Sequence, residues 1–397
     1  MSDQYQSSNV FNPPDRLLLG PGPSNVHPKV IQAMTAPMLG HLDPDFVAIM
    51  DDVQRMLRLV FKTKEGFTLP VSGTGTAGME AALVNLLEPG DTIVIAVNGF
   101  FGGRLEDIAT RIGARVERVD FEWGSVVDPQ KVREVVQRQD SVKMVGVVHV
   151  ETSTGVISPL EDIAAIAHEK DALLLVDAVT SLGGCDVDMD SWDLDVVYSG
   201  TQKCLGAPSG LAPLALSGRA MEALRKRSSK VPSFYLDVSI LDQYWNEGGG
   251  RTYHHTAPIT MIYALWQALD LLLLEGLEER FARHHRVASA LRAGLSAIGL
   301  EPIVKSNWAP PLTTVAIPDG ISDTAVRGRM LREHDIEIGG GLGVFKDKAW
   351  RIGLMGYNAA PANALRVLSA LEQALAAEGY EVARGRSLEA AQMSLAS

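Results

Sequence analysis

A single lysine lies in a loop rich in small and hydroxyl residues, directly after an apolar segment that ends at Val197. The loop reads Ser199-Gly-Thr-Gln-Lys203-Cys-Leu-Gly206. A lysine held at the end of a strand is partly desolvated, which lowers its pKa and makes its neutral amine nucleophilic. Lys203 is therefore a candidate Schiff-base lysine. A solvated surface lysine is the alternative, and it is the commoner case for a lysine taken at random.

A second candidate is the loop Ser72-Gly-Thr-Gly-Thr-Ala-Gly-Met-Glu80, between a predicted strand and a predicted helix. Small residues leave backbone amides free, and the helix N-terminus adds a positive dipole end, so the loop suits a phosphate. The same glycines match the dinucleotide fingerprint, but that motif needs an acid at the end of the next strand. That strand ends in Asn98-Gly99. The hydroxyls of Thr74 and Thr76 favour a lone phosphate monoester, and a turn without a ligand is the alternative.

The third candidate is Asp177, which closes the apolar run 173–176. Ligands of open α/β sheets bind beyond the carboxyl ends of the strands. A carboxylate there is costly unless it is paired, and a pyridinium nitrogen is a suitable cation. An N-cap for the next segment is the alternative. Together with Lys203 and the Thr74 loop, Asp177 completes the parts of a pyridoxal-phosphate site, in which Ser199, Thr201 and Gln202 could also hold the phosphate.

The elements that position these residues alternate between strands and helices. Unbroken apolar runs predict strands, and helical spacing predicts helices between them. The predicted strands are 67–71, 92–97, 116–119, 143–150, 172–177 and 194–198; the predicted helices are 45–61, 76–87, 104–112, 129–137 and 160–168. Such strands indicate a mostly parallel sheet covered on both faces.

The pattern changes after residue 257. Two long helices are expected at 259–274 and 279–298, with Gly276 between them, followed by strands at 311–317 and 350–353 and a helix at 361–377. We expect an N-terminal extension (1–20), a large cofactor-binding domain (21–275) and a small C-terminal domain (276–397). Residues 1 to about 15 look unstructured, and the tail from Val382 carries no clear core signal.

The bulk composition excludes several classes of protein. The chain has 397 residues and is 46% hydrophobic, yet no apolar run reaches the length of a membrane span. A net charge of −12 argues against a general nucleic-acid binder. The N-terminus lacks the layout of a secretory signal, and two cysteines in a long chain fit a reducing compartment. We expect a cytoplasmic protein without a membrane or nucleic-acid partner.

The chain resembles the class V, fold-type I aminotransferases, and within them the alanine:glyoxylate and serine:glyoxylate group. The resemblance runs from about residue 17 to 371. The matching segments are 20–25, 79–85, 88–91, 151–155, 176–184, 198–203, 253–256 and 350–353. It implies an α/β fold: a large domain with a mostly parallel seven-stranded sheet sandwiched by helices, plus a smaller C-terminal α/β domain.

The resemblance also implies pyridoxal 5′-phosphate as the cofactor and assigns residues to it. Lys203 and Asp177 are the catalytic positions. Thr74, Gly75 and Thr76 match the phosphate loop, although some members carry histidine where Thr76 stands. The remaining cofactor positions are Phe101 (where relatives stack a tryptophan on the ring), Thr152 (near the phenolic oxygen), Val179 (under the ring) and Gln202 (on the phosphate).

Three further residues complete the site that the resemblance implies. Tyr253 and Thr256 match residues that reach the phosphate of the neighbouring subunit, which implies a homodimer with shared active sites. Arg351 matches the residue that holds the substrate carboxylate through two parallel hydrogen bonds. We expect no metal: adjacent histidines such as His254 and His255 rarely face one ion, and no H-E-x-x-H motif occurs.

The implied activity moves an amino group from a small amino acid, alanine or serine, to glyoxylate by a ping-pong mechanism, with Lys203 as general acid and base. Segments 121–124, 202–206 and 355–358 also resemble (S)-ureidoglycine:glyoxylate aminotransferases, whereas 253–256 and 151–155 favour the alanine/serine side. A cysteine desulfurase would need a mobile cysteine. A nicotinamide oxidoreductase would leave Lys203 unexplained, and a non-catalytic binding protein would not need both Lys203 and Arg351.

Overall fold

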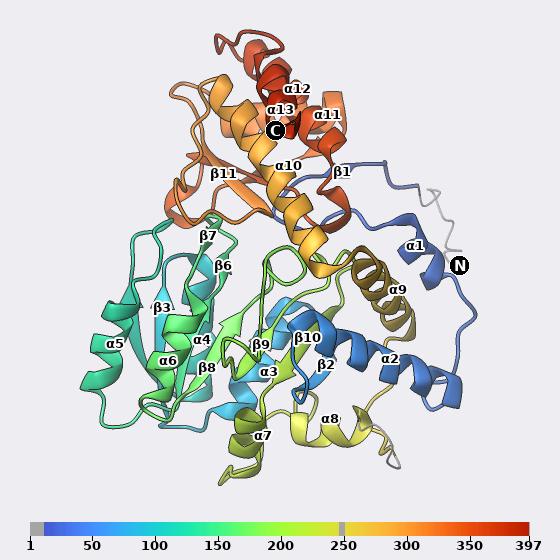
Figure 1. The fold of residues 1–397 in the computed structure, drawn as a ribbon, viewed down its shortest axis with the longest axis vertical. Helices are drawn as coiled ribbons and strands as arrows, with labels where there is room; N and C mark the ends of the chain where they lie inside the picture. Colours follow the sequence, from blue (N-terminus) through green and yellow to red (C-terminus); the bar gives the residue numbers. More distant parts are fainter. Residues whose placement is uncertain (1–11, 246–250, 397) are drawn as a thin grey trace, which may run out of the picture.

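The computed structural model describes residues 12–245 and 251–396. Residues 1–11, most of the predicted extension, lie outside the described part. The chain forms a large lobe and a small lobe, each with its own hydrophobic core, and the small lobe lies above the large one in Figure 1. The predicted domain division at residue 275 stays a prediction.

A seven-stranded sheet forms the centre of the large lobe, with the strand order β2-β10-β9-β8-β5-β3-β4. Its neighbours pair in parallel, except that β10 runs antiparallel to both β2 and β9. The strands are β2 (Phe67–Ser72), β3 (Thr92–Val97), β4 (Arg115–Asp120), β5 (Met144–Val148), β8 (Leu173–Asp177), β9 (Val196–Tyr198) and β10 (Leu211–Leu216). The predicted α/β class with a mostly parallel seven-stranded sheet is confirmed.

Helices cover both faces of this sheet. The large lobe contains α1 (Pro28–Met34), α2 (Pro44–Phe61), α3 (Gly75–Leu86), α4 (Phe100–Ile112), α5 (Pro129–Arg138), α6 (Leu160–His168), α7 (Gly218–Arg225), α8 (Val238–Trp245) and α9 (Ile259–Glu275), with a short hairpin of β6 (Val150–Glu151) and β7 (Val156–Ile157). The connections through α3 and α4 lead along the sheet toward β4, whereas those through α5 and α6 lead back from β4. Because such crossovers are right-handed, α3 and α4 lie on one face of the sheet and α5 and α6 on the other. The packing of α3 on α4 and of α5 on α6 agrees with this arrangement.

The strand β10 was not identified from the sequence, although a seventh strand was implied by the resemblance. Its run Leu-Ala-Pro-Leu-Ala-Leu contains Pro213, and a proline inside a run argues against a central strand. In the structure Pro213 lies opposite Pro70 of β2. The two residues without an N–H thus face each other, which limits the loss of ladder hydrogen bonds.

The small lobe packs helices against a three-stranded sheet of order β11-β14-β13. Its elements are β1 (Leu17–Leu18), α10 (Leu277–Ala297), β11 (Leu312–Ala316), α11 (Asp323–His334), β12 (Ile336–Glu337), β13 (Gly339–Gly340), β14 (Ala349–Gly353), α12 (Pro361–Ala377), α13 (Arg386–Ala396) and the 3-10 turns η1 (Gly343–Phe345) and η2 (Gly356–Asn358). The N-terminal strand β1 pairs with β12, so residues from both ends of the chain build this lobe.

The tail from Val382, which carries no clear core signal in the sequence, contributes to the core of the small lobe. Helix α13 packs along α10 and buries Ala391 and Ser387 completely. Small residues on one face of a helix allow close approach to a neighbouring helix. They carry a weak hydrophobic pattern in the sequence, which explains the missed signal.

The helices α9 and α10 meet at Gly276, which has a φ of 86°. Among the described residues, no single helix is long and apolar enough to span a membrane, and the one pair that passes that test together, α9 with α10, is bent by 86°. Figure 1 shows α10 running from this bend into the small lobe. The bend is therefore the junction of the two lobes.

Candidate active site

Lys203 lies in the loop after β9 and is 7% exposed. Its Nζ donates a hydrogen bond to the carbonyl oxygen of Pro21. Gly22 makes this approach possible, because a Cβ at that position would lie 2.5 Å from Cδ of Lys203. Burial, with a smaller effect of the Arg351 charge, lowers the pKa of Lys203 to about 8. The amine thus has the environment expected of a nucleophilic lysine, and its role stays a prediction.

Asp177 ends β8, next to the strand that leads to Lys203, and is 3% exposed. Its Oδ1 accepts a hydrogen bond of 2.9 Å from the backbone N–H of Val179, and its Oδ2 accepts one of 2.7 Å from the hydroxyl of Tyr198. Burial raises the pKa of Asp177 despite these bonds. The bond to Val179 is the local cap named as the alternative role. The unfavourable burial of the carboxylate is also what a cationic partner would relieve.

The predicted phosphate loop joins β2 to α3. Thr74 is the N-cap of α3, yet its side chain makes no capping hydrogen bond. A Cβ on Gly75 would lie 3.0 Å from Cγ2 of Val179, so the loop packs directly beside the Asp177 turn. The buried Oε1 of Gln202 has no hydrogen-bond partner within the described residues. The helix N-terminus at this corner suits an anion. Gln202 could donate a hydrogen bond to an anion only through its side-chain amide N–H₂, because its Oε1 is an acceptor.

Arg351 lies in the middle of β14 and is 7% exposed. Its Nε donates to the carbonyl oxygen of Gly340 at 2.8 Å, and its Nη1 to that of Thr152 at 3.1 Å. Burial lowers the pKa of Arg351 to about 10, partly offset by attraction to Glu151. Across residues 12–245 and 251–396, no carboxylate forms an ion pair with this guanidinium. A buried cation without a counter-ion is a site for an anionic ligand.

Phe101 lies in the first turn of α4, which begins four residues earlier than the sequence pattern predicted. The reason is tertiary: the carboxylate of Glu151 accepts hydrogen bonds from the N–H groups of Phe101 and Gly102 at 3.1 and 3.4 Å. Glu151 also accepts from the Ser153 hydroxyl at 2.6 Å and is fully buried. Glu151 begins the segment 151–155 that carries the family resemblance, but no role was predicted for it. Its place beside the predicted cofactor residue Thr152 was the available signal.

Arg104 was also missed. Its Nη1 donates a hydrogen bond of 3.1 Å to the hydroxyl of Thr76, and its guanidinium lies 4.8 Å from the ring centre of Phe101. Arg104 therefore connects the predicted phosphate loop with the predicted stacking ring. Its spacing of three from Phe101 on a helix was the signal that could have identified it.

The other predicted residues are placed as follows. Thr152 follows β6, and its hydroxyl lies 2.5 Å from that of Thr180. Tyr253 is 55% exposed, and Thr256 is exposed as well. Within the described residues no hydrogen bond joins either of them to the Thr74 loop, whereas Nε2 of His255, which lies between them in the sequence, is 3.0 Å from the Ser72 hydroxyl. Through His255, the segment 253–256 thus lies at the edge of the site. The contact of Tyr253 and Thr256 with the phosphate of a neighbouring subunit stays a prediction.

Neither cysteine has the environment of a nucleophile. Cys185 and Cys204 are both buried and unpaired. Burial raises the pKa of the Cys204 thiol to about 12 and that of Cys185 well above its usual range. A desulfurase needs an accessible thiolate, so the geometry does not support that alternative.

Comparisons with known proteins agree with this geometry. A family described as "Aminotransferase class-V" matches residues 16–361. The chain is 46% identical to alanine–glyoxylate aminotransferase from Nostoc sp., whose structure superimposes with a TM-score of 0.92 over 94% of this chain and 99% of that one. It is 40% identical to ureidoglycine–glyoxylate aminotransferase from Bacillus subtilis, with a TM-score of 0.95 over 98% and 100% of the two chains. It is also 41% identical to alanine–glyoxylate aminotransferase from Rattus norvegicus, over 93% of this chain and 89% of that protein.

Proposed function

Because the chain belongs to the class-V aminotransferase family, we propose that it moves an amino group from a small amino acid to glyoxylate, with Lys203 and Asp177 as its catalytic residues. Family membership makes it an aminotransferase, and this excludes the nicotinamide oxidoreductase and the non-catalytic binding protein. The observation that carries the proposal is that three predicted site residues lie close together. Lys203, with a depressed pKa, has Asp177 and Arg351 as electrostatic neighbours within one buried site.

The residues present fit pyridoxal 5′-phosphate, the cofactor that the family implies. Thr74, Gly75, Thr76 and Gln202 would hold its phosphate. Asp177 would accept a hydrogen bond from its protonated ring nitrogen, because burial makes the charged form of that carboxylate unfavourable and a cationic ligand would relieve this cost. Val179 and Phe101 would contact the two faces of its ring, and Thr152 its phenolic oxygen. When bound, the cofactor supplies the electron sink that amino-group transfer requires.

Lys203 would carry the proton transfers. With a pKa of about 8, a substantial fraction of its Nζ is neutral near pH 7.5, so it can take a proton, and it can return that proton later. Arg351 would orient both substrates, because the amino acid and the keto acid each present a carboxylate to the same guanidinium. Its two backbone hydrogen bonds fix the plane of that group, which favours a bidentate contact.

Glyoxylate is the proposed acceptor, because it appears in the names of both the alanine–glyoxylate and the ureidoglycine–glyoxylate relatives. For the donor, alanine or serine is our first choice, supported by the identity of 46% to the Nostoc enzyme. (S)-ureidoglycine is the second choice, supported by the TM-score of 0.95 with the Bacillus enzyme. Turnover of purified protein with each donor against glyoxylate and pyruvate will choose between them.

Reduction by borohydride tests the central residue. The purified protein should absorb visible light, lose this band on reduction, and carry the reduced adduct on the peptide that contains Lys203. An adduct on another lysine, or a protein without the band after incubation with the cofactor, would contradict the proposal.

We also propose a homodimer in which Tyr253 and Thr256 reach the phosphate of the partner subunit. Exposed apolar side chains of the large lobe support an interface: Met38 is 71% exposed, Leu42 51%, Ile31 49% and Tyr253 55%. Mixing a Lys203→Ala variant with a Thr256→Ala variant should restore part of the activity, because a mixed dimer contains one intact site. Proven subunit exchange without recovery would contradict a shared site.

Two further proposals concern the domain division and the cellular location. The chain divides near Gly276 into a cofactor-binding domain and a smaller domain, supported by the two separate cores. A cytoplasmic location is supported by two cysteines that are both unpaired.

A further inference from the structure

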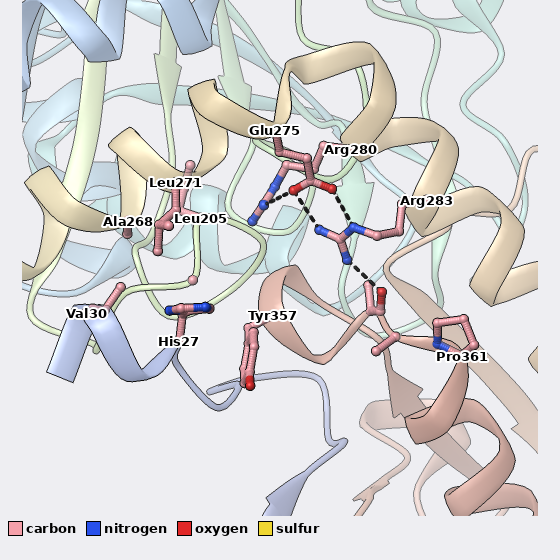
Figure 2. Close-up of a pocket in the computed structure, with 13 residues that line it drawn as sticks. His27, Val30, Leu205, Ala268, Leu271, Glu275, Arg280, Arg283, Tyr357 and Pro361 are labelled. Atoms are coloured by element: carbon pink, nitrogen blue, oxygen red, sulfur yellow. Dashed lines mark hydrogen bonds and ion pairs between the residues drawn. The ribbon is translucent and has the colours of Figure 1, made fainter. Parts of the chain in front are cut away.

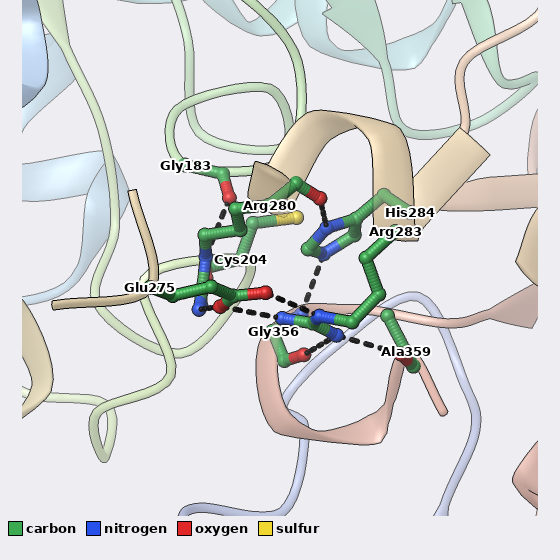
Figure 3. Close-up of polar contacts among 8 residues, drawn as sticks. All are labelled: Gly183, Cys204, Glu275, Arg280, Arg283, His284, Gly356 and Ala359. Atoms are coloured by element: carbon green, nitrogen blue, oxygen red, sulfur yellow. Dashed lines mark hydrogen bonds and ion pairs between the residues drawn. The ribbon is translucent and has the colours of Figure 1, made fainter. Parts of the chain in front are cut away.

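A network of charged side chains lies behind the Lys203 loop, at the bend between α9 and α10. It consists of Glu275, the last residue of α9, with Arg280 and Arg283 in the first turns of α10 (Figure 3). Nothing in the proposed reaction uses these residues. Because they lie at the junction of the two lobes, they can fix the position of one lobe relative to the other.

Arg280 binds the large lobe at two backbone carbonyls. Its Nη2 donates a hydrogen bond of 2.6 Å to the carbonyl oxygen of Cys204, the residue after Lys203. Its Nε donates one of 2.9 Å to that of Gly183, beyond the Asp177 turn. Its Nη1 lies 2.7 Å from a Glu275 oxygen, and the residue is 6% exposed. One guanidinium thus fixes the backbone next to Lys203 and the segment that follows Asp177.

Arg283 binds the small lobe in the same manner. Its Nη1 donates to the carbonyl oxygens of Ala359 and Gly356 at 2.6 and 3.1 Å, and its Nη2 to Glu275 at 2.9 Å. The neighbouring His284 accepts a hydrogen bond of 3.0 Å from the N–H of Gly356. Glu275 therefore joins an arginine that holds the large lobe to an arginine that holds the small one.

The Gly356 turn touches the Lys203 loop directly. A Cβ on Gly356 would lie 3.0 Å from the carbonyl oxygen of Cys204 and 3.3 Å from that of Lys203. Gly356 follows β14, the strand that carries Arg351, by three residues. One short turn therefore connects the Arg351 strand to the backbone of Lys203.

A cavity of about 270 Å³ borders the network and is lined by His27, Leu205, Gly206 and Tyr357 together with the charged side chains (Figure 2). Side chains do not fill this space. The lobes are therefore joined there by the polar contacts of Arg280, Glu275 and Arg283 rather than by apolar packing. The charges here do not favour an anion site in the cavity, since Glu275 already forms ion pairs with both arginines.

We propose that Arg280 is a positioning residue for Lys203, and that the Arg280–Glu275–Arg283 network couples the strand of Arg351 to the Lys203 loop. The inference rests on the proposed function, because it assumes that Lys203 transfers the proton and that Arg351 holds the carboxylate. Without the network, the amine of Lys203 would lose its fixed place relative to the bound substrate.

The test compares Arg280→Gln and Arg280→Lys with Arg286→Gln, a control on the same helix whose side chain is exposed. Misplacement of a catalytic group by about 1 Å costs on the order of a hundredfold, so kcat of Arg280→Gln should fall roughly ten- to a hundredfold with both substrates. The KM values should change by less than about threefold, because Arg351 is untouched. The Arg286→Gln control should match the wild type.

A second readout does not depend on turnover. In the cofactor-bound protein, the pH midpoint of the visible band should move by about half a unit or more in Arg280→Gln, because the electrostatic environment of Lys203 changes. If Arg280→Gln does not fold, Arg280→Lys serves instead, since lysine keeps the charge but cannot reach both carbonyls. A folded Arg280 variant with the wild-type midpoint and kcat would overturn the inference.

The two proposals fail in distinguishable ways. A wild-type protein without a visible band, or with the borohydride adduct on another lysine, contradicts the proposed function. A wild-type protein with the band on Lys203, combined with Arg280 variants that behave like the Arg286→Gln control, contradicts only the coupling.

Discussion

Two arginines near the Lys203 loop, Arg351 and Arg280, illustrate two uses of a buried charge. Both are almost fully buried, at 7% and 6% exposed, and both donate to two backbone carbonyls. Arg280 also binds Glu275 at 2.7 Å, whereas Arg351 has no ion-pair partner within the described residues. A compensated buried cation can fix structure, and an uncompensated one favours an anionic ligand.

The pKa values express the same difference. Burial lowers the pKa of both guanidinium groups. At Arg280 the strongest opposing influence is its direct partner Glu275, while at Arg351 it is the more remote Glu151, which is engaged in capping α4. The region of Arg351 thus suits an anionic ligand, whereas Arg280 already has a counter-ion within the protein.

The largest effect is expected at Asp177, whose charge acts on the pKa of the Lys203 amine in the direction opposite to that of Arg351. Changing Asp177 to Asn should leave the cofactor bound and slow the half-reaction with the amino donor. Without the carboxylate the bound ring nitrogen would be less protonated and the ring a poorer electron sink, so the rate should fall at least roughly a hundredfold. Stopped-flow absorbance measures this rate. Full activity in the variant would mean that the carboxylate only caps the Val179 turn.

The pH dependence of stability tests whether burial of Lys203 is as unfavourable as its pKa of about 8 indicates. Between pH 8 and the unfolded value near 10.5, the unfolded chain binds more protons, so stability should rise with pH in this window. Below pH 8 the cost of burying the charged amine, about 3 kcal/mol, is fully present. Lys203→Met should remove it, as urea unfolding of cofactor-free protein at pH 7.5 and pH 10 will measure. An equal effect at both pH values would contradict the depressed pKa.

Arg351→Lys tests the anionic-ligand side of the comparison. Lysine keeps the charge but cannot form two coplanar hydrogen bonds with a carboxylate. A lost charge-assisted hydrogen bond costs about 1.5–3 kcal/mol, so kcat/KM should fall roughly ten- to a hundredfold for both the amino donor and glyoxylate. Steady-state kinetics with each substrate varied will show this. If only the donor were affected, the two substrates would use different anchors.

The smallest effects are expected in the unfolding free energies of two variants, Glu275→Gln and Arg351→Met, which should differ in direction. Glu275→Gln should lower the unfolding free energy by about 1–2 kcal/mol, less than for a fully buried pair because Glu275 is 26% exposed. Arg351→Met should leave it unchanged or raise it, since this removes a buried charge without a counter-ion. Denaturant titration of the cofactor-free variants measures both. Destabilisation of equal size in both would remove the distinction between the two arginines.

Much of the large lobe could be predicted from the sequence because its strands are continuous apolar runs. The strand 92–97 and the helix 160–168 were predicted with the bounds observed. The start of α4 could not be predicted, because the carboxylate that caps it comes from Glu151, about fifty positions away. The helix α13 was missed because its buried face consists of small residues such as Ser387 and Ala391.

The sequence by itself determined the order of the chemical groups along the chain: a loop rich in glycine and threonine after one strand, an acid at the end of another and a lysine after a third. In a parallel sheet these ends meet at one edge, so local patterns were sufficient to bring Thr74, Asp177 and Lys203 together. Only the tertiary structure decided which charges are compensated. Arg351 and Arg280 look alike in the sequence, and their difference depends on Glu275 and on backbone carbonyls that folding brings from distant segments.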